Sequence, residues 1–424
     1  MLDLKLLRND PERVRRAIET KGESADLDAL LALDERRRTI LQDVERKKAE
    51  RNRASEQIAG LKRSGEDASA QIASARRLGE EIKQLDEELR RVEADLDDGL
   101  LWIPNLPHET VPIGPDADSN VEIRRWGTIP PETFRPANHW EIGSELGLFD
   151  LERASRVSGS GFVFYTGLGA LLQRALIQMM LDRHTREGDY QEISAPYLVR
   201  GESLEGTGQL PKLAEDMYRT GEDALYLIPT AEVPITNLFR GEILDAADLP
   251  RRYVGYTACF RREAGAAGRD TRGLVRVHQF DKVELVKFVR PETSYDELEA
   301  LVGDAEAILQ ALEIPYRVLS LATGDLSFAA AKCYDLEAWA PAEQRWLEVS
   351  SCSNFEDFQA RRIGVRYRDE EGKVRYVHTL NGSGLALPRV IAAMLELFQT
   401  ERGGVRVPEA LRPYLGGREE LAAP

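Results

Sequence analysis

A proline-poor stretch from about residue 27 to residue 101 constrains the fold of this chain more than any other feature. In its second half, apolar residues recur at alternating spacings of three and four: Ala75, Leu78, Ile82, Leu85, Leu89, Val92 and Leu96. This spacing is typical of helices that pack knobs into holes. A weaker series precedes it, formed by Leu33, Ile40, Val44, Ala54, Ile58 and Leu61. Lys47 and Arg51 interrupt that series, and their aliphatic stems can cover the same stripe.

The two halves of this stretch are separated by turn and N-cap residues at Ser64–Ser69, which predict two antiparallel helices joined at a tip. Residues 34–63 hold 10 basic and 6 acidic side chains, whereas residues 66–98 hold 5 basic and 11 acidic ones. Opposite charges would therefore face each other. Each helix of roughly 35 residues would be about 50 Å long, so we expect a protruding arm. Its basic residues, taken alone, indicate only a solvated coiled coil.

The composition favours a soluble globular protein in a reducing compartment. Of 424 residues, 42% are hydrophobic and 31% charged, and the net charge is -16. A diffuse cationic coat is thus excluded, and any polyanion must be bound locally. Three scattered cysteines, Cys259, Cys333 and Cys352, fit neither a disulfide framework nor a metal knuckle, so we expect a cytoplasmic protein. The charged N-terminus predicts neither a signal peptide nor a membrane span.

The proline-poor helical pattern ends at Ile103 and Pro104, which predicts the domain organisation. We expect an N-terminal domain over 1–103 with its arm at 27–101, a linker over 104–126, and a second domain over 127–424. In the second domain we expect a helix over 167–186, a strand over 191–198 and a last helix over about 385–399. Short apolar runs separated by turns, at 224–228, 254–260, 275–289, 334–339, 346–350 and 376–380, predict a mainly antiparallel sheet flanked by helices. The fold class is therefore α+β.

Common catalytic motifs are missing from the sequence. There is no Walker phosphate loop, Gly159–Gly161 is a bare G-x-G that indicates a turn, and none of the five histidines is spaced as in metalloproteases. His378 is read as a sheet residue. The unusual feature is a Gly/Arg-rich loop between two strands, with five arginines whose forked guanidinium groups suit a polyphosphate: Arg261, Arg262, Arg269, Arg272 and Arg276. Side chains repeat every two residues along the returning strand, so one face is expected to carry Arg276, His278, Phe280, Lys282 and Glu284.

These segments resemble the class II aminoacyl-tRNA synthetases, and within them the bacterial-type seryl-tRNA synthetase family. The second class motif stands as Phe260–Glu263, the first as the helix before Tyr190–Pro196, and the third as Gly382–Arg389. Thr230–Glu232, Glu348–Asn354 and the arm extend the resemblance over essentially the whole chain. Two departures are Pro388 before Arg389, in a first helical turn where proline is tolerated, and Leu397–Phe398 after Glu396.

The resemblance implies that the chain activates L-serine with ATP to seryl-adenylate and pyrophosphate, then transfers serine to tRNA(Ser), and to tRNA(Sec) where present. The catalytic residues it implies are Arg261, Glu348 and Arg389. Arg261 would hold the α-phosphate and Glu263 the adenine amino group, Phe280 would stack on adenine, and Arg276 with Arg389 would hold the γ-phosphate. The implied ATP site is completed by Arg262, Val277, Val349, Ser350 and Ser351. Glu348 and Ser351 would ligate Mg²⁺ carried with ATP, and no zinc is expected.

For serine, the resemblance implies a site made of Thr230, Ala231, Glu232, Arg261, Glu284, Asn381 and Ser383. For tRNA, it implies that the arm grips the long extra stem through Arg46, Lys47, Lys48, Arg51, Arg53, Arg76 and Arg77, because too few residues follow the last motif to form an anticodon-binding domain. It also implies a homodimer with tRNA bound across subunits; the apolar helix from Leu168 to Met180 is compatible with that interface. No membrane partner is expected.

Two rival readings stay open at this stage. A non-synthetase class II ligase that loads another acceptor would keep the ATP motifs but usually lose the arm. A coiled-coil adaptor with a degenerate core would lose the ATP residues. ATP–pyrophosphate exchange with serine separates the adaptor from both enzymes, and charging of tRNA transcripts separates the two enzymes.

Overall fold

The computed structural model describes residues 1–131, 134–264 and 272–422 and divides them into two compact units. The first unit comprises residues 1–19 and 23–104, and the second comprises residues 20–22 and 105–424. Arg269, one of the five arginines of the Gly/Arg-rich loop, lies outside the described residues.

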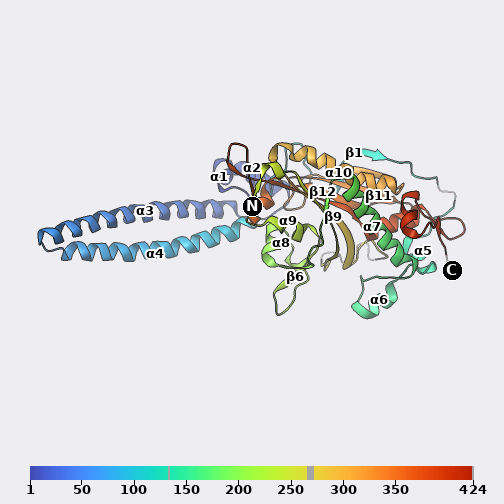
Figure 1. Cartoon of the computed structure of the whole chain (residues 1–424), viewed down its shortest axis with the longest axis horizontal. Helices are drawn as coiled ribbons and strands as arrows, with labels where there is room; N and C mark the ends of the chain where they lie inside the picture. The colour runs from blue at the N-terminus through green and yellow to red at the C-terminus, as the bar shows by residue number, and fades with distance from the viewer. Residues whose placement is uncertain (132–133, 265–271, 423–424) are drawn as a thin grey trace. The chain divides into compact units, whose positions relative to one another are not determined.

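The first unit is dominated by a helical hairpin. After α1 (Leu4–Asn9) and α2 (Pro11–Thr20), the long helices α3 (Leu27–Ser64) and α4 (Ser69–Leu100) lie side by side (Figure 1). α3 ends at Gly65, whose φ of 75° is left-handed and favours glycine. In the turn, the Asp67 carboxylate accepts a hydrogen bond from the Ser69 backbone N–H at 2.9 Å. The predicted tip between two antiparallel helices is confirmed.

The heptad positions form the interior of this hairpin. Ile40, Val44 and Val92 are buried together, with Leu33, Leu85 and Leu89 packed around them. At the polar interruption, Lys47 Nζ lies 2.5 Å from Glu81 Oε2 on the facing helix. Arg37 Nε lies 3.0 Å from Glu93 Oε1, and Arg36 pairs with Glu88. The expected facing of opposite charges is therefore present as ion pairs between the helices.

The second unit is built on an eight-stranded sheet in the order β1-β10-β11-β12-β15-β9-β8-β4, antiparallel except for the parallel pair β4–β8. Its strands are β1 (Val121–Trp126), β4 (Gln191–Glu192), β8 (Arg251–Phe260), β9 (Gln279–Val289), β10 (Tyr316–Ser320), β11 (Lys332–Ala340), β12 (Arg345–Asn354) and β15 (His378–Ala386). The smaller strands are β2 (Phe149–Asp150), β3 (Phe164–Tyr165), β5 (Leu198–Arg200), β6 (Leu225–Leu227), β7 (Ile243–Asp245), β13 (Arg366–Arg368), β14 (Val374–Tyr376), β16 (Val405–Arg406) and β17 (Glu420–Leu421). The helices are α5 (His139–Glu145), α6 (Leu151–Ser158), α7 (Leu168–Glu187), α8 (Gly201–Thr207), α9 (Glu232–Thr236), α10 (Ser294–Ala311), α11 (Phe358–Ile363) and α12 (Leu387–Leu397).

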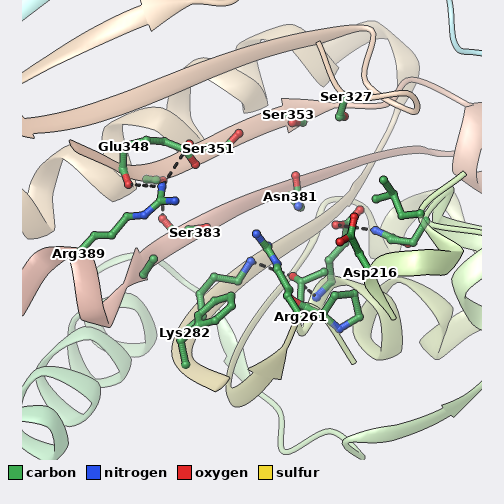
Figure 2. A pocket seen from close by; sticks show the side chains of 18 of the residues that line it. Asp216, Arg261, Lys282, Ser327, Glu348, Ser351, Ser353, Asn381, Ser383 and Arg389 are labelled. Atoms are coloured by element: carbon green, nitrogen blue, oxygen red, sulfur yellow. Dashed lines mark hydrogen bonds and ion pairs between the residues drawn. The ribbon is translucent and has the colours of Figure 1, made fainter. Parts of the chain in front are cut away.

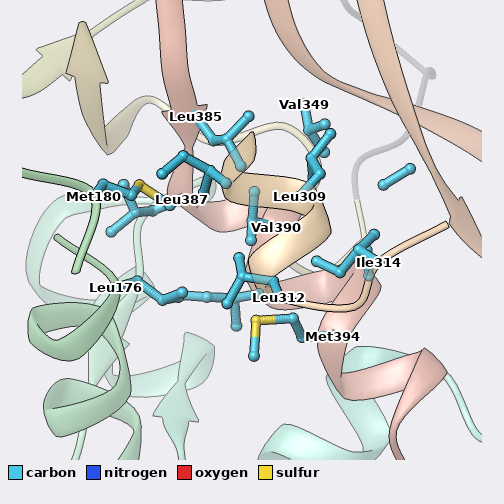
Figure 3. Close-up of a cluster of buried hydrophobic side chains, with 14 of the residues drawn as sticks. Leu176, Met180, Leu309, Leu312, Ile314, Val349, Leu385, Leu387, Val390 and Met394 are labelled. Carbon is cyan, nitrogen blue, oxygen red and sulfur yellow. The ribbon is translucent and has the colours of Figure 1, made fainter. Parts of the chain in front are cut away.

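One face of the sheet carries the main hydrophobic core. Leu176 and Met180 of α7, Leu309 of α10 with Leu312 directly after that helix, and Val390 and Met394 of α12 meet Val349 of β12 and Leu385 of β15 (Figure 3). Each such side chain contributes roughly 1.5–3 kcal/mol when fully buried. Because strand side chains alternate between faces, the residues between these apolar positions point to the opposite face. That opposite face is where the polar site lies.

Several expectations need correction. Residues 191–198 form two separate strands, β4 and β5, because Pro196 lies between them and has no N–H for a ladder. The strand expected over 275–289 begins only at Gln279, so Arg276 and His278 precede it. Residues 104–126, expected to be a linker, include strand β1, which pairs with β10. The apolar face of α7 packs inside its own unit.

The last helix, α12, begins near its expected start, with Pro388 in its first turn. Proline is tolerated at this position because the backbone N–H groups of a first helical turn have no hydrogen-bond partner within the helix. Among the described residues, no helix combines the length and apolar character needed to cross a membrane.

Candidate active site

A cavity of about 560 Å³ lies on the polar face of β9, β12 and β15. These strands are neighbours in the sheet, with Asn381 opposite Ser353 and Ser383 opposite Glu284. The predicted site residues that line the cavity are Thr230, Glu232, Arg261, Glu263, Arg276, Val277, Phe280, Glu348, Val349, Ser350, Ser351, Asn381, Ser383 and Arg389. In Figure 2, Glu348, Ser351 and Arg389 group at one end, and Arg261 and Lys282 at the other.

A bulge in β12 determines how Glu348 and Ser351 are presented. Leu336 of β11 pairs with Ser350 while the next residue, Glu337, pairs with Glu348, so β12 has one extra residue at Val349. Residues three apart on a regular strand would point to opposite faces. The extra residue changes the phase, so Val349 stays in the core while Glu348 and Ser351 both line the cavity.

Arg389 joins three parts of this end of the cavity. Its Nε donates to the Val275 carbonyl at 3.2 Å, and its Nη1 donates to the Glu348 carbonyl at 2.8 Å. The same Nη1 lies 3.3 Å from Glu348 Oε2. These contacts hold the guanidinium at this end of the cavity before any ligand binds (Figure 2).

The other arginines also have protein partners. The Arg261 guanidinium lies over the Phe280 ring at 5.1 Å, a cation–π contact, and its Nε donates to the Pro229 carbonyl at 3.4 Å. Arg276 Nη1 lies 2.6 Å from Glu263 Oε2. Two residues expected to contact different parts of ATP are thus paired with each other in this structure.

A buried charged cluster forms the floor of the cavity. Lys282 Nζ donates to Thr230 Oγ1 at 2.9 Å and lies 2.5 Å from Glu284 Oε2. Asn381 Nδ2 donates to Glu284 Oε1 at 3.1 Å, while the buried Asn381 Oδ1 accepts from no donor among the described residues. Glu284 is fully buried beneath Lys282, and burial raises the pKa of its carboxyl group.

Glu232 is the second buried carboxyl group of the floor. Burial, followed by the nearby charge of Glu284, raises its pKa to about 7. Gln359 Nε2 donates to Glu232 Oε1 at 2.7 Å, and Thr379 Oγ1 donates to Gln359 Oε1 at 2.7 Å. Gln359 therefore presents its N–H group to Glu232 because Thr379 fixes its amide orientation. A carboxyl group with a pKa near neutrality can change its charge when a cation binds.

The outgoing limb of the Gly/Arg-rich loop is anchored by Asp216. The Asp216 carbonyl accepts from the Arg262 N–H at 2.9 Å, and its carboxylate accepts from the Ala264 N–H at 2.8 Å. Between them, Glu263 has a φ of 52°, an uncommon conformation for a residue with a side chain. Such strain persists only where neighbouring contacts hold it.

Not every predicted site residue lines the cavity. Ala231 is fully buried at the start of α9, and Glu284 lies behind Lys282. Arg262 is exposed and points no atom into the lining. His278 also lies outside the lining; its N–H donates to the Gly161 carbonyl at 2.7 Å.

Several residues at the site carry little or no recognisable signal in the sequence. The sequence predicts only that Lys282 lies on one strand face, although its position between Phe280 and Glu284 on that face indicates a place in the site. Gln359 and Asp216 belong to no motif that the sequence shows. Ser327–Ala329 also line the cavity, from a turn between β10 and β11 that the sequence pattern did not connect with the site.

The residues expected to hold Mg²⁺ offer hard oxygen ligands. Ser351 pairs in register with Asp335, whose carboxyl group accepts a hydrogen bond from Ser351. Burial, and then the nearby Glu348 carboxylate, raise the pKa of Asp335 well above its ordinary value. A carboxylate, a hydroxyl group and a second acid whose charge is disfavoured without a counter-ion fit a divalent cation bound together with phosphates.

The basic residues of the hairpin fall into two groups. Lys47 is paired with Glu81 across the hairpin, Arg46 with Asp43, Arg76 with Glu80, and Arg77 with Glu81. Lys48 and Arg53 are exposed and have no ion-pair partner among the described residues, and Arg51 is half-buried. Some of the residues predicted to contact tRNA therefore form ion pairs within the hairpin, and others are exposed without an ion-pair partner among the described residues.

Two family models match the chain. Residues 1–107 match the seryl-tRNA synthetase N-terminal domain, and residues 214–398 match the tRNA synthetase class II core domain (G, H, P, S and T). These spans coincide with the hairpin unit and with the strands that carry the cavity.

Curated and solved relatives agree with both models. Serine–tRNA ligase from Geobacillus kaustophilus is 58% identical over 423 residues, 99% of this chain and 100% of its own. The enzyme of that name from Carboxydothermus hydrogenoformans is 57% identical over 98% of each chain. The seryl-tRNA synthetase of Pyrococcus horikoshii, solved in complex with ATP, superposes with a TM-score of 0.96 at 39% identity and covers 100% of both chains. The cytoplasmic serine–tRNA ligase of Naegleria fowleri, solved with AMP, gives 0.90 at 31% identity over 100% of this chain and 99% of its own. The hairpin, the polar face of the antiparallel sheet and these full-length relatives together show that the chain belongs to the seryl-tRNA synthetase family of class II aminoacyl-tRNA synthetases.

Proposed function

We propose that this protein is a serine–tRNA ligase that forms seryl-adenylate from L-serine and ATP and then esterifies tRNA(Ser). The observation that carries the proposal is the polarity of one cavity. Arg389, Glu348 and Ser351 stand at one end, suited to phosphates and a cation, and the buried acids Glu232 and Glu284 lie at the other. ATP and a small amino acid fit such a cavity together.

Arg389 and Arg276 are the proposed partners of the γ-phosphate, and Arg261, which lies toward Lys282 and the amino acid end (Figure 2), is the proposed partner of the α-phosphate. Arg389 is already oriented by the Val275 and Glu348 carbonyls. Arg276 is paired with Glu263 at 2.6 Å, so ATP exchanges this ion pair for a phosphate contact and an adenine amino contact. Phe280 offers its ring to adenine on the side opposite Arg261.

Glu348 and Ser351 are the proposed Mg²⁺ ligands, with Asp335 beneath them. When bound there with ATP, the cation neutralises charge on the phosphates. The chain's own contribution is to hold two oxygen ligands on one face through the β12 bulge.

At the amino acid end, Glu232 is the proposed partner of the serine ammonium group. Thr230, Asn381 and Ser383 surround the remaining space, and Ala231 contributes only backbone. Asn381 Oδ1 has no donor among the described residues, so a serine hydroxyl group can supply one. Glu284 acts from behind by holding Asn381 and Lys282 in place.

The first reaction step needs no side-chain nucleophile. The serine carboxylate, ionised at neutral pH, attacks the α-phosphorus, a new P–O bond forms, and pyrophosphate leaves with the electrons of the broken bond. The chain contributes alignment and charge stabilisation, chiefly from Arg261 and Arg389. In the second step a terminal ribose hydroxyl group of tRNA attacks the adenylate carbonyl and AMP leaves.

For tRNA we propose that the N-terminal domain, residues 1–103, grips the extra stem, with tRNA(Sec) as a second acceptor where that tRNA exists. Lys48, Arg51 and Arg53 are the best-placed candidates on α3, because Lys47 is engaged by Glu81. The separate compactness of the hairpin unit supports the division into an N-terminal domain and a catalytic domain over 127–424.

We also propose a homodimer and a cytoplasmic location. Exposed apolar side chains near the first class motif support a subunit interface, with Phe164 44% and Leu198 47% exposed. The three cysteines are buried and unpaired, which supports a reducing compartment.

Serine-dependent ATP–pyrophosphate exchange and charging of tRNA(Ser) transcripts test the proposal. The wild-type chain should show both activities. Arg261→Ala should abolish exchange while the melting temperature stays near that of the wild type. Exchange without charging would favour a ligase for another acceptor, and absence of both would favour an inactive adaptor; either result refutes the proposal.

For the arm, replacing residues 36–92 by a short linker should leave exchange within roughly tenfold of the wild type, a barrier change of about 1.4 kcal/mol, while charging falls much further. Normal charging by the shortened chain would show that tRNA selection lies elsewhere.

A further inference from the structure

A buried cluster of three side chains lies outside the cavity lining. His139 begins α5, Glu396 lies near the end of α12, and Glu343 lies in the turn between β11 and β12. The side chains of His139 and Glu396 are both 0% exposed. The ligand atoms of the three residues lie within 4.8 Å of one another, a grouping that suggests a metal site.

The hydrogen bonds show that the cluster is a relay and not a metal site. The Leu274 N–H donates to His139 Nε2 at 3.1 Å, so the lone pair of that nitrogen is used. The ring proton is therefore on Nδ1, which donates to Glu396 Oε1 at 2.8 Å. A neutral imidazole engaged at both nitrogens has no lone pair left for a metal ion.

Glu396 is itself fixed from two directions. Its Oε1 also accepts from the His139 N–H at 3.2 Å, and its Oε2 accepts from the Ala342 N–H at 3.0 Å. The carboxylate is thus satisfied by three donors although it is fully buried. The tautomer and the orientation of His139 follow from this anchoring.

The relay ends on the returning limb of the Gly/Arg-rich loop. Leu274 is fully buried, and Leu274–Val277 line the cavity. The preceding residue, Gly273, has a φ of +72°, and a Cβ there would lie 2.2 Å from His139 Nε2. The backbone of the limb therefore packs directly on the imidazole ring.

Helix α12 holds two successive parts of this limb. Through His139, Glu396 fixes the N–H of Leu274; through its own Nε, Arg389 fixes the carbonyl of Val275 at 3.2 Å. Arg389 and Glu396 are seven residues apart, about 10 Å along one rigid helix. The next residue of the limb is Arg276, and after it comes Val277.

We propose that His139 is a positioning residue of the ATP site: as the acceptor for the Leu274 N–H it fixes where Arg276 stands, without touching ATP, and Glu396 sets the tautomer that makes Nε2 the acceptor. The inference rests on the proposed role of Arg276 as a phosphate ligand. It predicts that losing the acceptor at Nε2 weakens ATP use selectively, whereas losing the donor at Nδ1 does not.

Two substitutions separate these halves of the imidazole. The amide of His139→Gln reaches the place of Nε2 and keeps an acceptor for the Leu274 N–H. The amide of His139→Asn reaches the place of Nδ1 and keeps a donor for Glu396. Each variant leaves one buried polar group without a partner, so both should lose similar thermal stability.

In ATP–pyrophosphate exchange, His139→Asn should raise the KM for ATP at least fivefold and leave the KM for serine within twofold. His139→Gln should keep both KM values within twofold of the wild type. Equal ATP KM values for the two variants, or ATP and serine KM values that rise together, would overturn the inference. An inactive wild-type chain would instead refute the proposed function.

Gly273→Ala provides a second probe that leaves the His139 side chain itself unchanged. It disturbs the same contact from the loop, so it too should raise the ATP KM, and in the double variant with His139→Asn the two effects should be less than additive. Fully additive effects would show that the two residues act independently. If the histidine variants do not fold, an unchanged ATP KM in Gly273→Ala refutes the inference by itself.

Discussion

The raised pKa of Glu232 predicts how serine use depends on pH. Burial and the nearby Glu284 charge raise this pKa from 4.5 to about 7, so the carboxyl group is about 90% protonated at pH 6 and about 10% at pH 8. If the serine ammonium group needs the ionised form, the KM for serine should rise roughly tenfold as the pH falls from 8 to 6 at saturating ATP. The measurement is ATP–pyrophosphate exchange at varied serine concentrations.

Two variants test the assignment to Glu232. Glu232→Gln should have a high serine KM that no longer changes with pH in this range. Because ATP titrates equally in assays of both proteins, this variant is also the control for the titration of ATP. Gln359→Leu removes the hydrogen bond that favours the ionised carboxylate, so it should move the transition to higher pH. A serine KM that is flat in the wild type, or a pH dependence that survives in Glu232→Gln, would refute the reasoning.

The same pKa has a consequence for stability. Because the folded carboxyl group binds its proton more tightly than the unfolded one, its contribution to stability is complete below about pH 4.5 and is lost as the pH rises through about 7. The rise from 4.5 to about 7 corresponds to roughly 3 kcal/mol at about 1.36 kcal/mol for each pH unit. Relative to the wild type without ligand, Glu232→Gln should therefore gain melting temperature between pH 5 and pH 8, and a constant difference would contradict the shift.

Further outcomes are expected elsewhere in the chain. Ser351→Ala should raise several-fold the Mg²⁺ concentration needed for half-maximal exchange. Cys333 Sγ lies 3.1 Å from Ser351 Oγ, and Cys333→Ser, as the control, should leave this concentration unchanged. Combined Ala replacements of Lys48, Arg51 and Arg53 should lower the slope of log tRNA affinity against log salt by about two to three, with Arg91→Ala, also exposed on the hairpin, as the control. Ile40→Ala, in the hairpin core where Ile40 is 1% exposed, should destabilise the first unit by about 2–5 kcal/mol in chemical unfolding, and a loss below about 1 kcal/mol would show that the heptad seam is poorly packed.

The hairpin was predictable because its determinants are local. Heptad spacing, turn residues and complementary charge each act over a few residues, and Val92 with Ile40 in the interior follows directly from them. The antiparallel sheet was predictable in type because short apolar runs separated by turns admit few alternatives. Strand ends were less predictable: the N–H of His278, directly before β9, donates to the Gly161 carbonyl, and no local pattern connects these two residues.

The details of the site depend on contacts between distant residues. A period-two reading of β12 would place Glu348 and Ser351 on opposite faces, and only the pairing with β11 reveals the bulge at Val349. Gln359 meets Glu232 across 127 residues of chain, and no local pattern marks it. The resemblance supplied Glu348 and Ser351 as a pair but could not supply the hydrogen bonds that orient them.

The charge balance at the floor of the cavity shows why a site this deeply buried can still accept a zwitterion. Lys282 and Glu284 neutralise each other at 2.5 Å, and Glu232 remains partly protonated, so the floor without ligand carries little net charge. In the proposed binding mode, the serine ammonium group brings the positive charge that makes ionised Glu232 favourable, while the serine carboxylate faces Arg261. Alanine would restore the same charges but would leave Asn381 Oδ1 without a donor, at a cost of about 1–3 kcal/mol for an unsatisfied buried group. In the proposed binding mode, the charges of this floor favour a zwitterionic amino acid, and the acceptor Asn381 Oδ1 favours one that carries a hydroxyl group.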